Sequence, residues 1–305
     1  MNALMSTLFM FSVLFPSKLW YAPDQAVTVT VKADAPVKLV LVDFLGRVVD
    51  KKLEVEAGEK QIDVRQLYPD TGSGTYVLYA VPKDKELPAF VGTPLVIEIR
   101  NDKRVGAPVG PVVVKVEPLR YAVMETDAGS MTMAFYYDVA PNTVTNWLSL
   151  AEEGYFDGQV FHRIVPSFVL QAGDPLGKNG ERAGTGGPGY MIDAEFNDRP
   201  HIKGVLSMAR QGDPLERQGM MPRSEAANSA SSQFFICLDY SRTKALDGKY
   251  TVFGRVIDGM NVIDKLAATP VGDRDRPNNP PEIKKVTIKT VTPGNNPYEK
   301  PLTAE

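Results

Sequence analysis

The chain has 305 residues, of which 43% are hydrophobic, and a formal net charge of −3. This length is enough for about two domains. The 34 basic residues are scattered along the chain, which argues against a nucleic-acid-binding protein. A single cysteine, Cys237, rules out an intrachain disulfide and lies in an apolar run, so we expect it to be a buried, unreactive side chain.

The chain begins with an uncharged, mostly apolar segment at residues 3–15. This segment is too short to span a membrane but has the length of the apolar part of a signal peptide. No basic residue precedes it, and no small-residue cleavage site follows it. We expect residues 1–23 to be a signal segment and the protein to be exported to the periplasm or cell envelope. The alternative is a strand or helix packed on the first domain of a cytoplasmic protein.

Residues 24–104 alternate between apolar and polar side chains, as short half-buried strands do. We expect strands at 26–32, 37–42, 61–64, 75–81 and 94–100, with a turn at 44–47. Strands of this length and spacing predict a β-sandwich domain. Its sequence, which includes LVDFLGRVV and GTYVLYA, resembles immunoglobulin-like modules of secreted and flagellar-hook-capping proteins.

Glycine and proline surround a short valine run at residues 105–118, which predicts a linker. The elements expected after it are strands at 122–126 and 130–135, a helix from Pro141, a helix at 259–268 and a strand at 283–291. Strand pairs interrupted by two helices predict a closed antiparallel barrel with helical caps, because closure removes exposed strand edges. Residues 293–305 contain three prolines and are expected to form a flexible tail.

The most informative motif is the run from Phe161 to Asp174, which sets Arg163 and Gln171 among large apolar residues. Polar groups on an apolar surface cost free energy unless they find partners. The strand is therefore a candidate binding surface, whereas Phe161 and Ile164 are expected to belong to the barrel core. The alternative is an ordinary aromatic strand with one arginine exposed at an edge.

A glycine cluster at residues 184–189 matches the spacing G-x-G-x-x-G. In a dinucleotide-binding protein this motif follows an apolar strand and opens a helix. Here no such strand precedes it, Pro188 lies within it and no helix follows. The cluster therefore argues against a nucleotide site.

The sequence also argues against a metal site and against the active site of a serine hydrolase. The two histidines, His162 and His201, are far apart and lack the spacing of metal ligands. The carboxylates between residues 193 and 198 lie in a polar region and are expected to be solvated. No G-x-S-x-G motif occurs, and the serine pair at 231–232 has no evident histidine partner. We expect no metal and no cofactor.

The 161–174 motif resembles the cyclophilin signature, and four further segments occur in that family's order. They are GTGG at 184–187, GVLSMA at 204–209, SQFFI at 232–236 and LDGKYTVFG at 246–254. The resemblance covers about residues 120–292, within a second domain that we expect at 119–292, and none of residues 1–115. It implies a mainly β chain whose second domain is a closed eight-stranded antiparallel barrel capped by two helices.

The resemblance also implies a peptidyl-prolyl cis-trans isomerase that acts on proline-containing polypeptides and assists their folding. Rotation about an amide bond has a barrier of about 18–20 kcal/mol, and no bond is broken. Such an enzyme needs no nucleophile, metal or cofactor. We expect a monomer without a stable membrane span.

The site residues follow from matching positions in the family motifs. The resemblance implies three catalytic side chains, Arg163, Gln171 and Phe168, and eight substrate-binding ones, His162, Val169, Ala209, Arg210, Gln233, Phe235, Leu246 and Tyr250. Arg163 would donate to the prolyl nitrogen, which favours the twisted state over the planar one. Gln171 would orient Arg163 or the substrate carbonyl.

Three positions depart from the family pattern. Arg210 replaces the usual asparagine, Ala245 a tryptophan and Tyr250 a histidine. Ala245 puts cyclosporin affinity in doubt, whereas Arg210 and Tyr250 are expected to alter backbone contacts or to favour acidic neighbours of the proline. The segment 211–227 is longer than the family's short connection, and is either a flexible surface loop or a lip that narrows substrate choice.

A second function remains open at this point. The chain could be a non-catalytic module that binds proline peptides, with the sandwich as an adhesion or docking domain. Retention of Arg163, Phe168, Gln171 and Phe235 favours the enzyme.

Overall fold

The computed structural model of the chain describes residues 13–21, 25–49, 53–68, 71–100 and 113–299. It is mainly β, as predicted, and divides into two compact units. Among the described residues, unit 1 comprises those up to Arg120 together with 290–299, and unit 2 comprises residues 121–289.

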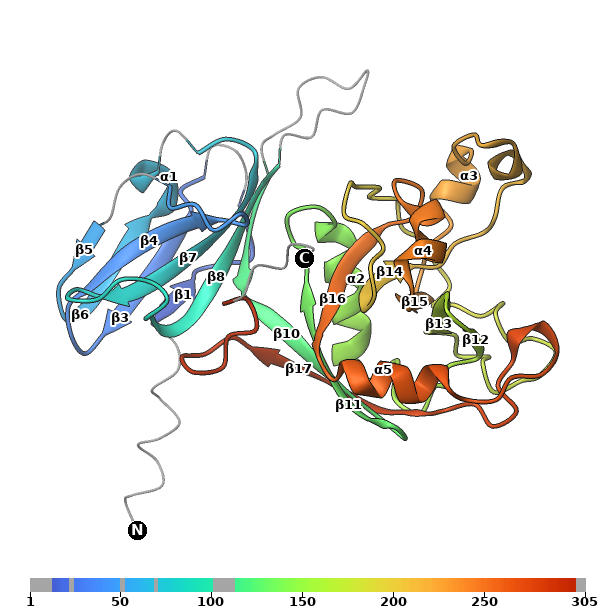
Figure 1. Ribbon diagram of the computed structural model, residues 1–305. Coiled ribbons are helices and arrows are strands. Elements are labelled where there is room, and N and C mark those ends of the chain that lie inside the picture. The colour runs from blue at the N-terminus through green and yellow to red at the C-terminus, as the bar shows by residue number, and fades with distance from the viewer. Residues whose placement is uncertain (1–12, 22–24, 50–52, 69–70, 101–112, 300–305) are drawn as a thin grey trace, which may run out of the picture. The chain divides into compact units, whose positions relative to one another are not determined.

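Unit 1 consists of two antiparallel sheets and a short helix, α1 (Val64–Leu67) (Figure 1). The smaller sheet has the order β1-β3-β6, formed by β1 (Leu14–Pro16), β3 (Thr28–Ala33) and β6 (Gly58–Asp63). The larger sheet has the order β2-β9-β8-β7-β4-β5. Its strands are β2 (Trp20–Tyr21), β4 (Val37–Asp43), β5 (Leu53–Val55), β7 (Gly74–Pro82), β8 (Val91–Arg100) and β9 (Val113–Pro118).

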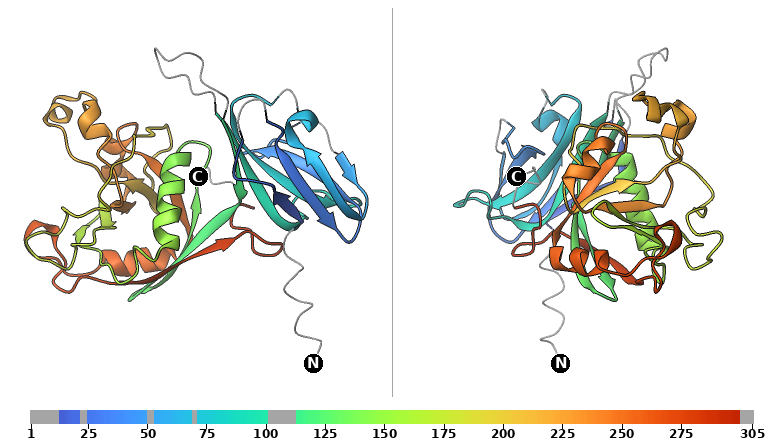
Figure 2. Two further views of the ribbon diagram at one scale, coloured as in Figure 1. Left: turned by 180° about the vertical axis from the view of Figure 1, so that it is seen from behind. Right: turned by 45° about the vertical axis from the view of Figure 1, so that its right-hand side comes forward.

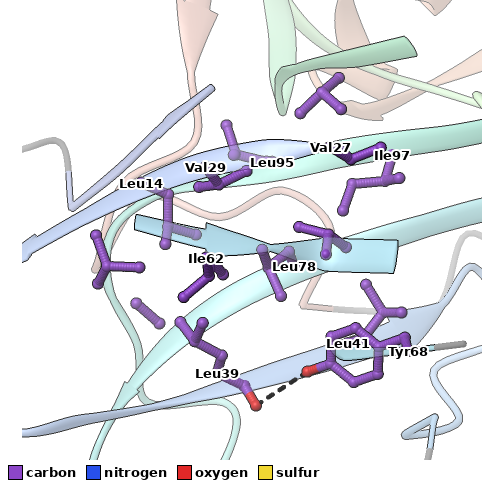
Figure 3. Packing of buried hydrophobic residues seen from close by; sticks show 14 of the residues in the cluster. Leu14, Val27, Val29, Leu39, Leu41, Ile62, Tyr68, Leu78, Leu95 and Ile97 are labelled. Atoms are coloured by element: carbon purple, nitrogen blue, oxygen red, sulfur yellow. Dashed lines mark hydrogen bonds between the residues drawn. The ribbon is translucent and has the colours of Figure 1, made fainter. Parts of the chain in front are cut away.

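Apolar side chains of the two sheets meet in one buried cluster (Figure 3). Val29 and Ile62 come from the smaller sheet, and Leu39 and Leu78 from the larger. Tyr68 closes one side of the cluster, where its hydroxyl donates to the carbonyl oxygen of Leu39 at 3.2 Å. Two sheets packed face to face confirm the predicted β-sandwich. Its likeness to immunoglobulin-like modules stays a prediction.

The predicted linker and N-terminal segment differ from what the structure shows. Residues 113–118 form β9, which pairs along its whole length with β8, so this part of the linker belongs to the sheet. Leu14 and Tyr21 lie in β1 and β2 and are 3% and 1% exposed. For residues 13–21 this matches the alternative of an apolar strand packed on the first domain. Residues 1–12 and 105–112 lie outside the described residues, so export stays a prediction.

The predicted flexible tail is anchored over the residues that the structure describes. The backbone N–H of Val291 donates to the carbonyl of Leu119 at 2.9 Å, and the Tyr298 hydroxyl donates to the carbonyl of Arg120 at 2.7 Å. The Tyr298 ring also lies edge-on to Phe44, with ring centroids 6.5 Å apart. Residues 290–299 are therefore part of unit 1, while 300–305 lie outside the described residues.

Unit 2 contains an eight-stranded antiparallel sheet in the order β12-β13-β15-β14-β16-β11-β10-β17. Figure 2 shows the ribbon of this unit, in green to red, from two further directions. The strands are β10 (Arg120–Thr126), β11 (Gly129–Phe135), β12 (Arg163–Val165), β13 (Val169–Ala172), β14 (Val205–Met208), β15 (Phe234–Cys237), β16 (Val252–Asp258) and β17 (Ile283–Thr290). The two longer helices are α2 (Pro141–Glu152) and α5 (Met260–Ala267). Shorter turns of helix are η1 (Pro214–Gln218), α3 (Ser224–Ala227), α4 (Tyr240–Thr243), η2 (Lys244–Leu246) and η3 (Asp273–Asp275). Over the described part of the chain, none of the helices combines the length and the apolar character that crossing a membrane requires.

The sheet closes because the chain just before β12 pairs with the start of β17. Val160 and Glu282 form an antiparallel bridge. The N–H of Phe161 donates to the carbonyl of Pro281 at 2.9 Å, and that of Ile283 donates to Gln159 at 2.8 Å. The predicted closed barrel is confirmed, and closure leaves neither edge strand fully open to another chain.

The two predicted helices pack on the barrel. Helix α2 contacts β16 and buries Trp147 completely, with its ring centroid 5.0–6.3 Å from those of four phenylalanines: Phe135, Phe156, Phe234 and Phe253. Helix α5 contacts β11 and buries Val262, Ile263 and Leu266, the stripe expected from the sequence.

Helix α2 is capped by a carboxylate from a distant segment. Glu195, expected to be solvated, accepts hydrogen bonds from the backbone N–H groups of Asn142 and Thr143 at 3.0 and 2.8 Å, and from the Thr143 hydroxyl at 2.8 Å. The first N–H groups of a helix have no partner within the helix. Glu195 supplies these partners, because the residue before the helix, Ala140, makes no side-chain cap.

The Glu195→Ala variant should lower the free energy of unfolding of unit 2 by about 1–2 kcal/mol, the usual cost of removing a helix cap. Denaturant unfolding monitored by tryptophan fluorescence would measure it, because Trp147 lies in the same helix. The control is Asp193→Ala, an exposed carboxylate two residues away. Equal stability losses in the two variants would contradict the capping role.

Candidate active site

Four neighbouring strands of unit 2 each contribute one residue to a single row. Arg163 on β12 pairs with Gln171 on β13, Gln171 pairs with Phe235 on β15, and Phe235 pairs with Ser207 on β14. Residues directly opposite each other on antiparallel strands point to the same face of the sheet. The pairing thus brings together Arg163, Gln171 and Phe235, which the sequence places in two separate motifs.

A pocket of about 150 Å³ opens on this face. Nine of the eleven predicted site residues line it: Arg163, Phe168, Val169, Gln171, Ala209, Arg210, Phe235, Leu246 and Tyr250. Val169 and Phe235 also belong to a buried apolar cluster that extends to Cys237, which is itself fully buried as expected. Burial raises the pKa of the Cys237 thiol. The pocket is therefore a small apolar depression with a guanidinium at its edge.

Hydrogen bonds connect this guanidinium to the glycine-rich loop. Nη1 of Arg163 donates to Oε1 of Gln171 at 3.4 Å, and Nη2 donates to Oδ2 of Asp275 at 3.2 Å. Nε2 of Gln171 donates to Oε1 of Gln233 at 3.0 Å, and Nε2 of Gln233 donates to the carbonyl of Gly186 at 2.9 Å. Gln171 thus contacts Arg163 directly, and its role in orienting Arg163 or the substrate carbonyl stays a prediction.

A larger pocket of about 850 Å³ shares Gln171, Ala209 and Arg210 with the first. Glycines of the 184–189 cluster line it, as does Gln233, which does not line the smaller pocket. The two pockets form a continuous candidate groove on unit 2, with the glycine-rich loop as one wall.

The glycines of this loop allow it to pack on a buried carboxylate. Asp174 is fully buried and accepts hydrogen bonds from the backbone N–H groups of Leu176, at 2.7 Å, and Gly184. A Cβ atom on Gly186 would lie 2.1 Å from Oδ1 of Asp174, so any other residue would force this carboxylate or the loop to shift. Close backbone approach to Asp174 therefore accounts for a glycine at this position without a bound phosphate.

His162, predicted to bind substrate, lines neither pocket. It is 4% exposed and lies just before β12, whose first residue is Arg163. Among the described residues neither ring nitrogen has a hydrogen-bond partner. Burial is the main cause that lowers the pKa of His162, with Asp174 opposing the shift.

A second buried histidine supports the pocket from behind, and sequence reasoning missed it. Nδ1 of His201 lies 2.8 Å from Oδ1 of Asp247, and Nε2 lies 3.1 Å from Oγ of Ser207. The His201 ring stacks on Phe235 with centroids 6.1 Å apart. Burial lowers the pKa of His201, and Asp247 opposes the shift.

Ser207, His201 and Asp247 are connected by hydrogen bonds as in a hydrolase triad, but the serine is not accessible to a substrate. Ser207 and His201 are both 0% exposed, and the Ser207 hydroxyl also donates to the carbonyl of Thr251 at 3.0 Å. A substrate cannot reach a buried nucleophile. The set is a polar support beneath Phe235, and the spacing of its members in the sequence carries no signal that could have revealed it.

Arg210 lines both pockets, yet all five of its N–H donors are engaged. Nε and Nη2 donate to the carbonyl of Lys249 at 3.1 and 2.9 Å, and Nη1 donates to that of Gln211 at 2.8 Å. Nη1 and Nη2 also donate to the two carboxylate oxygens of Glu216 at 3.0 and 2.6 Å. The hydrogen bonds from Arg210 are the main cause that lowers the pKa of Glu216.

The environment of Arg210 shows how its side chain is held in the groove. Its side chain is 2% exposed and its guanidinium lies over the Tyr250 ring, 4.1 Å from the centroid. All five donors are engaged within the protein, two of them by Glu216, so a preference for acidic neighbours of a substrate proline stays a prediction. Arg210 also braces Tyr250, a wall of the small pocket.

The segment 211–227 is folded around another buried carboxylate. Asp213 accepts hydrogen bonds from the N–H groups of Leu215 and Arg223, at 3.0 and 2.9 Å, and from Nε of Arg223 at 2.8 Å. The hydrogen bond from the Arg223 side chain is the main cause that lowers the pKa of Asp213. These hydrogen bonds organise part of the segment, whereas both alternatives, a flexible surface loop and a lip that narrows substrate choice, stay predictions.

Comparison with known proteins identifies the family. The model of the family described as cyclophilin type peptidyl-prolyl cis-trans isomerase/CLD matches residues 121–288, more than half of the chain. The chain belongs to this family. A peptidyl-prolyl cis-trans isomerase of Synechococcus elongatus is 42% identical over 137 residues, which are 45% of this chain and 80% of the relative. One of Schizosaccharomyces pombe is 39% identical over 164 residues, 53% of this chain and 94% of the relative.

Among solved structures, a cyclophilin-type isomerase of Cryptosporidium parvum is similar to this chain, with 27% identity and a TM-score of 0.48. The match covers 56% of this chain and 98% of that one. The family match ends within unit 2, so the family of unit 1 is not established.

The Arg210→Met variant should lower the free energy of unfolding of unit 2 by about 1–3 kcal/mol, because it leaves partly buried acceptors on Glu216 and Lys249 without their donors. It should also make the lip easier to cleave by protease. Thermal unfolding and limited proteolysis of the full chain would measure both effects. Arg217→Met, an exposed arginine in the same lip, is the matched control and should change neither. Equal behaviour of the two variants would contradict the bracing role.

The free energy of unfolding of unit 2 should decrease as the pH is lowered, because burial lowers the pKa of both His162 and His201. Above the unfolded-state pKa of about 6.5, both states are neutral and this contribution to stability is complete. Below it, the unfolded state binds more protons, so the free energy of unfolding decreases until the folded histidines also titrate. The slope is at most about 1.4 kcal/mol per pH unit for each histidine.

The His162→Leu variant isolates one of these contributions. Urea unfolding at pH 7.5, 6.0 and 5.0 should give a shallower loss of stability than in the wild type, because one proton-linked group is gone. A variant whose pH profile runs parallel to that of the wild type would contradict a depressed pKa for His162.

Proposed function

We propose that this chain accelerates rotation about X–Pro bonds in polypeptides, using the groove of unit 2. The observation that carries the proposal is the row of Arg163, Gln171 and Phe235 beside a small apolar pocket. The family to which the chain belongs supports the same reaction.

The pocket fits the proline ring by size and by character. Phe168, Phe235 and Leu246 are apolar and line a space of about 150 Å³. Burying a compact proline ring there removes its apolar surface from water, which is favourable. Both X–Pro isomers are populated, because they differ by only about 0.5–1 kcal/mol. An enzyme that holds the ring and lets the preceding carbonyl turn therefore acts on either isomer.

Arg163 supplies the stabilisation that distinguishes the twisted state from the planar one. When the amide twists, its nitrogen regains a lone pair that can accept a hydrogen bond. Arg163 uses one N–H toward Gln171 and one toward Asp275, and its other three N–H groups make no hydrogen bond within the described part of the chain. A guanidinium stays protonated at any physiological pH. Its attraction to the nitrogen grows only as the bond twists, which lowers the barrier.

The finer role that we propose is assistance to the folding of client proteins, in the periplasm or cell envelope if the N-terminal segment directs export. The alternative is a non-catalytic module that binds proline peptides. The complete row of groove residues favours catalysis, because binding alone does not require a donor held beside the pocket.

Arg163→Ala should reduce kcat/KM about 10²- to 10³-fold, as loss of one preorganised donor does in other enzymes. Its thermal stability should be nearly unchanged, because Arg163 is 40% exposed and surface ion pairs contribute little. A protease-coupled assay on a proline peptide with the full chain would measure the rate. Arg182→Ala, an exposed arginine near the glycine-rich loop, is the control and should keep full activity. Wild-type protein that binds the peptide without accelerating isomerisation would support the non-catalytic alternative.

A further inference from the structure

Asp275 contacts Arg163, although the two residues lie far apart in the sequence. It lies in η3, between α5 and β17, 112 residues after Arg163. Its Oδ2 lies 3.2 Å from Nη2 of Arg163, and the two side chains are 41% and 40% exposed. No motif in the sequence marks Asp275 as a site residue.

The backbone at this point is held in a conformation that its residues seldom adopt. Arg274 and Asp275 have φ angles of +59° and +60°, in the left-handed region that favours glycine. Two consecutive non-glycine residues in this region persist only where surrounding contacts enforce them, and such positions concentrate at functional sites. The strain here aims the Asp275 carboxylate at Arg163.

Several contacts enforce this turn. The N–H of Gly272 donates to the carbonyl of Arg276 at 2.8 Å, and a bridge joins Val271 to Pro277. Nη1 of Arg276 donates to the carbonyl of Gly180 at 2.6 Å, which fastens the turn to the segment that leads into the glycine-rich loop. Asp275 is therefore presented by an anchored turn.

We propose that Asp275 is a positioning residue for Arg163, an inference that rests on the proposed isomerase function. Gln171 holds Nη1 and Asp275 holds Nη2. Two fixed points on a planar group set both its direction and its rotation about the side-chain axis, whereas a single point leaves it free to swing. The remaining N–H groups are thereby aimed at the groove.

The contact restrains the guanidinium without occupying it. Only one oxygen of Asp275 bonds to Arg163, so one of the five donors is used, whereas a two-oxygen pair would take two. The pair is well exposed, and water weakens its attraction. Arg163 therefore keeps its charge and most of its donors for a substrate.

Three variants of the full chain test this role: Asp275→Ala, Asp275→Asn and, as a matched control in the same turn, Asp273→Ala. Asp275→Ala should lower kcat roughly 10-fold, less than the 10²-fold that a 1 Å misplacement can cost, with KM and thermal stability nearly unchanged. Asp275→Asn should keep activity within about twofold, because its amide oxygen can still accept from Nη2. The control should match the wild type.

A second measurement reads the position of Arg163 without using activity. The ¹⁵N relaxation of its Nε–H group should show faster internal motion in Asp275→Ala, and wild-type behaviour in Asp275→Asn. Unchanged kcat and unchanged relaxation in Asp275→Ala would overturn the proposal. Higher activity in both Asp275 variants would overturn it as well, since the carboxylate would then compete with substrate. Equal losses in both would assign the effect to charge and not to position.

The failure of this inference can be told apart from failure of the proposed function. Absence of activity in the wild type, or retained activity in Arg163→Ala, would contradict the isomerase proposal itself. In that case the relaxation of the Arg163 Nε–H group still decides whether Asp275 restrains the guanidinium.

Discussion

The register of β12, β13, β15 and β14 is the constraint on which the site depends. A shift of one residue would turn every side chain of a strand to the opposite face. The opposite face locks the register, because a second row of fully buried residues runs across the same strands: Ile164, Leu170, Ile236 and Leu206. Arg163, one residue from Ile164, can face the groove only while this apolar row stays inside the barrel. Core packing and catalytic geometry are therefore set by the same pairing.

Much of this site could be predicted from the sequence, because strand residues alternate and family motifs keep their order. Arg163, Gln171 and Phe235 lie within such motifs and within regular strands. Asp275 could not be found this way, since its role depends on a left-handed turn of non-glycine residues far along the chain. The sequence could not reveal that His201 supports Phe235, because the residues that His201 contacts come from separate segments of the chain.

The fold of unit 1 was predictable where strands are long and was mispredicted where they are short or rich in proline and glycine. Alternating or continuous apolar runs revealed β3, β4, β7 and β8, whereas β2 has two residues and no period to detect. Residues 293–299 contain glycine and proline, which indicate irregular backbone. Irregular backbone can still be anchored, and here one tyrosine, Tyr298, provides much of the attachment. The amino-acid composition of a segment indicates whether its backbone is regular, but not how many contacts attach it to the rest of the domain.

Because residues 290–299 return to unit 1, the isomerase is a domain inserted into unit 1 and does not simply follow it along the chain. The chain leaves unit 1 after Arg120 and re-enters it at Thr290. The first and last strands of the insert, β10 and β17, are neighbours in the barrel, so departure and return occur side by side. Within the part of the chain that the structure describes, two covalent crossings join the units, and a single proteolytic cut at either one leaves them connected. The sandwich must therefore await synthesis of the whole barrel before its last segment exists to be added.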